Sequence, residues 1–372
     1  MSASIKSTAL EPDASLDGPA RSLAQRLARA VPSYGLVMLT VALALLFSAL
    51  LPATFPTLFN LRAILADKSI IALLALAAMI PMITGKIDLT VGYGIVLWHI
   101  LAISLQTRYG LPWPAAVLIV LACAALFGML NGLLVEMAQI DSFIATLGTG
   151  TVLYAVAMWH SGGRQVVGEL PAGFTALAGA EWLGLPVAAF YVAAIALVLW
   201  AVTEFMPLGR ALYVIGANPK AAELNGLSVR RHVVGAFVAS GVLSGFAGVL
   251  LASRLQIGQA SVGLEFLLPA LVGAFLGSTT IRPGRVNVWG TLVGVAILAI
   301  GISGIQQFGG AFYVEPLFNG LTLLISIGIA GWAQQRRNAS IRRRISQRQL
   351  DEGAAPAVPP ASPVHRAADG PH

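Results

Sequence analysis

The sequence predicts an all-α polytopic membrane protein with about ten transmembrane helices, and three observations support this class. Of the 372 residues, 57% are hydrophobic and only 10% are charged, whereas soluble domains carry about 25% charged residues. The mean hydropathy is +0.81. Apolar runs close to the roughly 20 residues that a membrane-spanning helix requires recur along the chain. With so few charged groups, the surface of this protein must face mainly lipid.

Ten apolar runs are candidate spans. They cover approximately residues 34–52, 69–84, 87–105, 113–135, 142–160, 187–203, 233–253, 266–280, 286–305 and 316–333. The second, third and eighth runs are short or nearly fused to their neighbours, so nine and eleven spans are alternatives. The polar stretches TGKID (84–88) and TTIRPG (279–284) separate runs that lie very close together. These stretches therefore predict tight hairpins.

The distribution of Lys and Arg predicts which side of the membrane each loop faces. An even number of spans puts both termini on one side, together with every second loop. Of the 23 Lys and Arg residues, only five fall on the opposite side, namely Arg62, Lys68, Arg108, Arg164 and Arg254. Because positive charge marks cytoplasmic loops, both termini are predicted to be cytoplasmic.

The chain divides into three predicted parts. Residues 1–33 are polar, which predicts a cytoplasmic tail. Residues 34–333 contain the apolar runs and are the predicted transmembrane domain, and residues 334–372 are a second predicted cytoplasmic tail. The last tail is basic and then rich in Pro and Ala, which predicts that it is largely disordered. The formal charge of +7 resides at the ends and between the apolar runs, a pattern of membrane topology rather than of nucleic-acid binding. A single cysteine excludes an intramolecular disulfide.

Glycine spacing predicts close helix packing. Small residues four apart let helix backbones approach one another in lipid. Four such pairs lie within the runs, at Gly128/Gly132, Gly241/Gly245, Gly273/Gly277 and Gly290/Gly294. They indicate a tightly packed helical bundle but do not indicate the function of the protein.

Ionisable residues inside the runs are scarce. Asp88 stands at the start of the third run, where it either caps the helix through its carboxylate or lines a solute pathway. His99 lies midway along the same run, and we expect it to serve packing or an interface. A proton-coupled carrier needs carboxylate or histidine relays within the membrane. Since the sequence has no such relay, we expect the energy source to be a partner docked on a cytoplasmic surface.

One interior segment predicted to be cytoplasmic is long enough to dock a partner. It covers residues 204–232 and contains LGRALYVIGANPKAAELNGLSVRRH (208–232). Within it, Asn218 and Pro219 form a turn signal, a short Ala-rich helix follows, and Gly226 is a stop signal. A short helix lying across the cytoplasmic face is suited to mechanical coupling. An ordinary connecting loop is the alternative.

Five motifs resemble those of a known family. They are ITGKIDLTVG (83–92), NGLLVEMAQIDSFIATLGT (131–149), SGGRQV (161–166), LGRALYVIGANPKAAELNGLSV (208–229) and GAFLGSTTIRPGRVNVWGTLVG (273–294). In order and spacing, from about residue 60 to 333, they resemble the ribose-type sugar permeases of bacterial ATP-binding-cassette importers.

The resemblance implies a permease subunit that moves a monosaccharide-like solute across the inner membrane by alternating access. Its ten helices would form two inverted halves. The implied partners are a cytoplasmic ATP-binding subunit, a periplasmic solute-binding protein and a second permease copy or paralogue. ATP and Mg would be held by the partner ATPase. We expect no cofactor, catalytic residue or metal site in this chain, and no nucleic-acid partner.

The resemblance also assigns roles to residues of this sequence. The expected ATPase-coupling residues are Gly209, Arg210, Gly216, Asn218, Pro219, Ala222, Glu223 and Gly226. The residues expected to line the translocation pathway are Asp88, Thr90, Asn131, Phe143, Thr146 and Asn319.

Several alternatives stay open at this point. A branched-chain amino-acid importer permease shares the architecture, and an ion-coupled secondary carrier would use Asp88 or His99. A membrane enzyme would need the loop 161–186 with Glu169 and Glu181, which lacks a His/Asp cluster. The sequence departs from the family at Lys86, Arg282, Pro283 and Arg285, where glycine is commoner, and over GISGIQQFGGAFYVEP (301–316). These departures leave the identity of the solute open.

Overall fold

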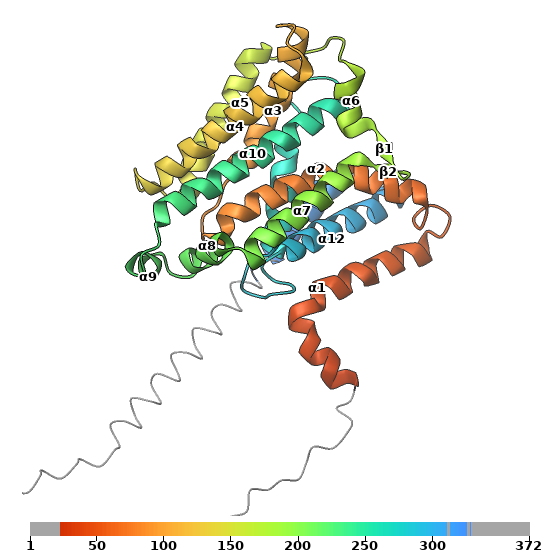
Figure 1. The fold of residues 1–372 in the computed structure, drawn as a ribbon. Helices are drawn as coiled ribbons and strands as arrows, with labels where there is room; N and C mark the ends of the chain where they lie inside the picture. The colour runs from red at the N-terminus through yellow and green to blue at the C-terminus, as the bar shows by residue number, and fades with distance from the viewer. Residues whose placement is uncertain (1–22, 311–312, 326–327, 329–372) are drawn as a thin grey trace, which may run out of the picture. The chain divides into compact units, whose positions relative to one another are not determined.

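The structure is a computed structural model that describes residues 23–310, 313–325 and 328, with side chains from Tyr34 onward (Figure 1). Seven helices of these residues are long and apolar enough to cross a membrane. They are α2 (Leu58–Ile83), α3 (Thr90–Thr107), α4 (Trp113–Glu136), α5 (Ser142–Ser161), α7 (Val187–Phe205), α10 (Val229–Leu255) and α12 (Val288–Gln307). The predicted all-α polytopic class is confirmed.

Three shorter apolar helices complete the correspondence with the ten predicted spans. They are Tyr34–Leu50 within α1 (Leu23–Leu50), Leu264–Leu276, and Val314–Ile325. The second of these combines the 3₁₀ turn η1 (Leu264–Phe266) with α11 (Leu267–Leu276). Helix α1 begins at Leu23, so helical structure extends into the predicted N-terminal tail. The predicted tail 334–372 lies outside the described residues, as do residues 326, 327 and 329–333 of the tenth predicted span.

The loop between α5 and α7 is more structured than its sequence suggested. It forms the short helix α6 (Ala172–Gly179) and a two-stranded antiparallel sheet of β1 (Glu181–Trp182) and β2 (Leu185–Pro186). Glu181 pairs with Pro186, and Trp182 pairs with Leu185. Leu183 and Gly184 both have positive φ, as a tight two-residue hairpin turn requires.

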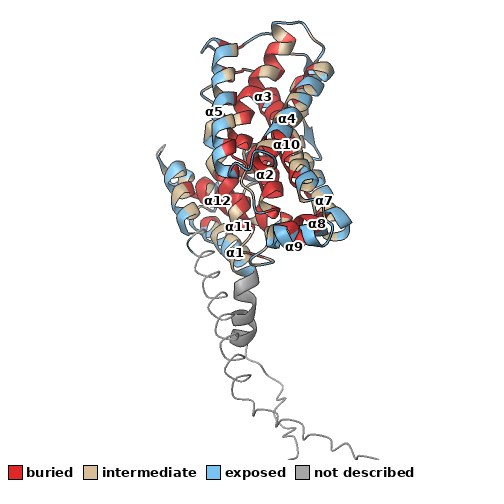
Figure 2. Cartoon of the chain, turned by 90° about the vertical axis from the view of Figure 1, so that its left-hand side faces the viewer, coloured by how far each residue is buried: buried red, intermediate tan, exposed pale blue. Residues whose placement is uncertain are grey.

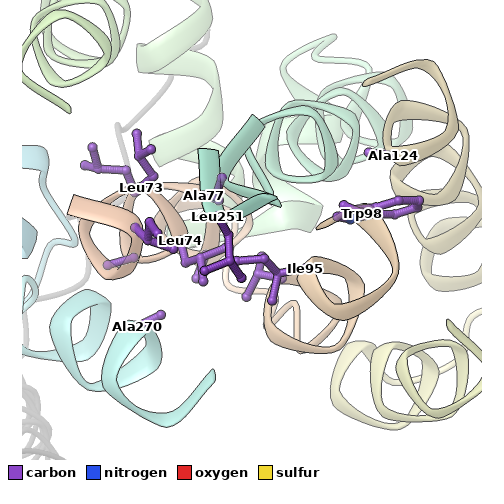
Figure 3. Close-up of a cluster of buried hydrophobic side chains, with 14 of the residues drawn as sticks. Leu73, Leu74, Ala77, Ile95, Trp98, Ala124, Leu251 and Ala270 are labelled. Carbon is purple, nitrogen blue, oxygen red and sulfur yellow. The ribbon is translucent and has the colours of Figure 1, made fainter. Parts of the chain in front are cut away.

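Helices α2, α3 and α10 form the centre of the bundle (Figures 1 and 2). Residues 69–81 of α2 are all buried, because this stretch is apolar around its whole circumference and no side of it suits water. Helix α10 contacts α2, α3 and α4, whereas α5 is exposed along its outer side (Figure 2). Figure 3 shows side chains of the buried cluster that these central helices share with α4 and α11, among them Leu74, Ile95, Ala124, Leu251 and Ala270.

The predicted glycine contacts are present. A Cβ placed on Gly128 of α4 would lie 2.3 Å from the carbonyl oxygen of Phe237 in α10. From the other side, a Cβ on Gly241 would lie 2.4 Å from the carbonyl oxygen of Ala124. A Cβ on Gly294 of α12 would lie 2.6 Å from the carbonyl oxygen of Gly273 in α11. Glycine thus brings α4 onto α10 and α11 onto α12 at backbone contact distance.

Loops predicted to be cytoplasmic meet at one end of the bundle. The first hairpin at Gly85, α8 (Pro207–Ala217) and the 277–287 loop line one cavity. A second cavity joins Lys86, the end of α4 at Glu136, and α9 (Pro219–Leu224). The alternation of loops inferred from charge therefore agrees with the folded arrangement.

Candidate functional site

The segment between α7 and α10 folds into two helices, α8 and α9. Pro207 and Pro219 occupy the first helical positions, where the missing N–H costs nothing and the fixed φ favours the helix. The side-chain oxygen of Asn218 accepts a hydrogen bond from the Ala221 N–H at 3.0 Å and caps α9. Gly226 follows α9 with φ +82°, a conformation that glycine adopts without strain. The predicted short helix and its stop are confirmed, and α8 is an addition.

Helix α8 presses against the end of α2. It buries Gly209, Ala211, Leu212 and Ile215. A Cβ on Gly216 would lie 2.0 Å from the carbonyl oxygen of Ile83, so only glycine permits this approach. The contact means that a displacement of α8 acts directly on the end of α2, a central helix of the bundle.

Helix α9 has one buried face and one exposed face. Ala222 is fully buried and packs with residues of α4, α5, α8 and α10, namely Val135, Ala145, Ile215, Val233 and Phe237. Lys220, Glu223 and Leu224 are exposed, and Leu224 is 84% exposed. Leu224 is not among the predicted coupling residues. The sequence could have indicated it, because Leu224 is a large apolar residue on a short helix in which Ala222 already faces the core.

Basic residues that depart from the family pattern anchor the cytoplasmic loops. Lys86 Nζ lies 3.3 Å from Glu136 Oε1, which ties the first hairpin to α4. Arg282 donates two hydrogen bonds, of 2.5 and 2.6 Å, to the Glu204 carboxylate at the end of α7. These bonds raise the pKa of Arg282 above its usual value. Both residues therefore serve contacts within the chain.

Arg285 and Tyr213 form a third anchor. The guanidinium carbon of Arg285 lies 3.4 Å from the centroid of the Tyr213 ring, a cation–π contact. The Tyr213 hydroxyl donates to the Val286 carbonyl oxygen at 2.7 Å. Burial raises the pKa of Tyr213, so the hydroxyl keeps its proton at neutral pH and stays a donor. The 277–287 loop is thereby fastened to α8.

Four of the six predicted pathway residues, Asp88, Thr90, Asn131 and Thr146, belong to one buried polar cluster, which we call the inner cluster. Asp88 Oδ1 accepts hydrogen bonds from the backbone N–H of Thr90, at 2.9 Å, and from the Thr90 hydroxyl. Asp88 Oδ2 accepts one from the Ser240 hydroxyl of α10 at 2.8 Å. Asn131 Nδ2 donates to Thr90 Oγ1 at 3.1 Å. The cluster thus joins the start of α3 to α4 and α10.

The inner cluster also satisfies the irregular backbone between α2 and α3. The N–H of Leu89 donates to Thr146 Oγ1 at 3.1 Å, and the N–H of Ile87 donates to Ser142 Oγ at 3.1 Å. Both hydroxyls lie on α5. Irregular backbone at membrane depth requires such partners inside the protein. Asp88 therefore accepts a hydrogen bond from the N–H of Thr90, the first residue of α3, while Leu89 holds the N-cap position without a side-chain hydrogen bond. A pathway role for these residues stays a prediction.

The other two predicted pathway residues lie elsewhere. Phe143 is 48% exposed in the first turn of α5. Asn319 is 3% exposed and lines a cavity with Lys68 and Glu315, toward the other end of α2. The structure therefore separates Asn319 from the inner cluster rather than joining all six residues in one place.

His99 is a satisfied core residue. Its Nδ1 lies 2.9 Å from the Ile95 carbonyl oxygen, and its Nε2 lies 3.1 Å from the backbone nitrogen of Gln259. The carbonyl needs a donor and the N–H needs an acceptor, so these two partners select the neutral tautomer protonated at Nδ1. The expected packing role agrees with this geometry.

The described chain is thus a multi-pass helical membrane protein in which two short helices, α8 and α9, connect α7 to α10. Residues 60–330 match the family model described as "Branched-chain amino acid transport system / permease component", and the chain belongs to this family. It is 31% identical over 297 residues to the ribose import permease protein RbsC of Bacillus subtilis, covering 80% of this chain and 90% of that relative. No solved structure matches.

Two further relatives have comparable coverage. The D-allose transport system permease protein AlsC of Escherichia coli is 26% identical, over 80% of this chain and 90% of its own length. The autoinducer 2 import system permease protein LsrD of Escherichia coli is 28% identical, over 79% and 91%. The chain is therefore a ribose-type transport permease of the bacterial inner membrane. The branched-chain amino-acid alternative is not favoured by these relatives.

Proposed function

We propose that this chain is the membrane subunit of an ATP-binding-cassette importer whose cytoplasmic ATPase docks on α8 and α9. The exposed face of α9 carries this proposal. It presents Lys220, Glu223 and Leu224 away from the bundle while Ala222 holds the helix in place. A partner that covers this face would bury Leu224 and could pair with Lys220 and Glu223.

The proposed solute is a monosaccharide-like molecule. The relatives that match over most of the chain are named for ribose, D-allose and autoinducer 2 import. A periplasmic solute-binding protein delivers the solute, and a second permease copy or paralogue completes the membrane unit. Residues 34–333 form the transmembrane permease domain, with the coupling segment at 204–232.

The mechanism follows from the packing of α8. ATP and Mg bind to the partner subunit, and ATP performs work only through its different affinity for the two conformations of the assembly. The close contact between Gly216 and Ile83 passes movement of α8 to α2 and hence to the core. Alternating exposure of the solute site is the expected result.

The test is co-purification of the full chain with the ATP-binding subunit of its importer. Leu224→Glu places a charge on the exposed face of α9, and we expect it to abolish association while leaving membrane insertion unchanged. Leu183→Glu is the matched control, because Leu183 is 79% exposed in the β1–β2 turn. Glu223→Arg is a second variant at the proposed interface.

The two outcomes have different meanings. Loss of the ATPase in the Leu224 and Glu223 variants, with retention in the Leu183 control, supports the docking role. Transport by the isolated wild-type chain along an ion gradient, without any bound ATPase, contradicts the importer and favours a secondary carrier.

A further inference from the structure

A polar cavity lies toward the start of α2 and the end of α10, the ends distant from α8 and α9. We call it the outer cavity. Its polar lining comes from α2, the end of α10, η1 and the helix Val314–Ile325, and consists of Asp67, Lys68, Arg254, Glu265, Glu315 and Asn319. Its volume of about 530 Å³ falls within the roughly 300–1,000 Å³ of small-molecule sites.

The cations of the outer cavity are already paired. Lys68 Nζ lies 2.9 Å from Asp67 Oδ2 and 3.1 Å from Glu315 Oε1. Arg254 Nη2 lies 3.3 Å from Asp67 Oδ1, and its Nη1 donates to the Ala66 carbonyl oxygen at 2.8 Å. An anionic ligand would have to compete with these carboxylates for both cations. The cavity is therefore poorly suited to a phosphorylated or carboxylated solute.

Two acceptors in the outer cavity remain free. Asn319 is 3% exposed, and its Oδ1 is buried without a hydrogen-bond donor. The Glu265 carboxylate has no ion pair within 4.0 Å among the described residues. A buried acceptor without a donor is rare in folded proteins and needs an explanation. A ligand that brings hydroxyl donors into the cavity supplies one.

The remaining wall of the outer cavity is apolar. Phe266, Leu268 and Pro269 line it from η1 and α11, beside the acceptors. A sugar presents hydroxyl groups around its edge and C–H groups on its faces. Such a molecule matches a site with surplus acceptors next to an aromatic and aliphatic wall.

We propose that the outer cavity binds a neutral polyhydroxylated solute, whose hydroxyl groups donate to Asn319 Oδ1 and to Glu265. This inference rests on the proposed function and adds two elements to it. It places a solute site within a single chain, and it restricts the solute to neutral sugars. Specificity then resides partly in the permease as well as in the binding protein.

The test is saturation-transfer NMR on the full chain in lipid nanodiscs, with D-ribose, D-allose and ribose 5-phosphate as probes. We expect signals from the two neutral sugars and none from ribose 5-phosphate. Asn319→Leu and Glu265→Leu each remove one side-chain acceptor, and we expect each to weaken binding by about fivefold, the loss of one hydrogen bond. Glu169→Leu, at an exposed residue of the 161–186 loop, is the matched control and is expected to bind as wild type.

Three results overturn the proposed site. They are unchanged binding in both variants, a preference for ribose 5-phosphate, and no signal from either neutral sugar. Glu265 is exposed, so its variant tests the site even if Asn319→Leu does not fold. ATP-driven uptake by the reconstituted importer separates the two proposals. Uptake by wild type together with unchanged binding in the variants refutes the site alone, whereas no ATP-dependent uptake refutes the proposed function.

Discussion

The inner cluster and the outer cavity use similar residues in opposite ways. Both place Asp, Asn and neighbouring polar groups among apolar helices. In the inner cluster each Asp88 oxygen has a donor, and Asn131 bonds to Thr90 and Thr149. In the outer cavity, Asn319 Oδ1 is buried without a partner. A polar residue that is satisfied within the chain holds helices together, whereas one that is left without a partner is available to a solute.

The largest effect is expected from Asp88→Ala. It leaves the Thr90 N–H, the Thr90 hydroxyl and the Ser240 hydroxyl without their acceptor. Since one orphaned buried group costs about 1–3 kcal/mol, we expect a loss of at least about 3 kcal/mol in unfolding free energy and poor insertion. Thermal unfolding of the purified chain measures it. Normal stability with abolished transport would instead assign Asp88 to the pathway.

The tight packing beside the inner cluster gives the next prediction. Gly216→Ala puts a Cβ against the Ile83 carbonyl oxygen, and overpacking of this kind costs about 1–3 kcal/mol. ATPase activity that no longer responds to solute is the expected functional result. Gly235→Ala in α10 is the control, because a Cβ there meets nothing within 4 Å. Equal behaviour of the two variants would show that the α8–α2 contact is unimportant.

The two asparagines test the comparison directly. Asn131→Leu removes both hydrogen bonds of a fully buried side chain, and we expect a loss of about 1–3 kcal/mol. Asn319→Leu removes a buried acceptor that has no partner, so stability should be unchanged or higher. Thermal unfolding of both variants decides the matter. A greater loss for Asn319→Leu than for Asn131→Leu would reverse the assignment of the two regions.

The smallest effect is expected at the cytoplasmic rim. Glu204→Gln breaks the ion pair with Arg282. The Glu204 side chain is 27% exposed and the Arg282 side chain is 46% exposed. Partly exposed pairs contribute about 1 kcal/mol or less, so the melting temperature should fall only slightly. The effect should also shrink at high salt, because salt screens exposed charges. A large, salt-independent loss would mean that the 277–287 loop is part of the stabilising core.

Local sequence signals determined most of the architecture. The runs of apolar residues gave the spans, since lipid requires each backbone group to bond within its helix. Asn218, Pro219 and Gly226 gave the bounds of α9, because capping and φ preferences act over a few residues. The distribution of Lys and Arg gave the alternation of loops, and spaced glycines gave the close helix contacts. Each of these signals is local or periodic.

Only the tertiary structure decided which polar residues are satisfied. Asp88 and Ser240 are 152 positions apart, and Lys68 and Glu315 are 247 apart. Asp88, Thr90 and Asn131 were predicted together with Asn319, yet packing satisfied the first three and left the last one without a partner. Hydrogen bonding between distant segments depends on how the helices pack, and the type of a residue alone does not predict its partner. The sequence therefore identified the candidates, and the fold decided which of them find hydrogen-bond partners within the chain and which one does not.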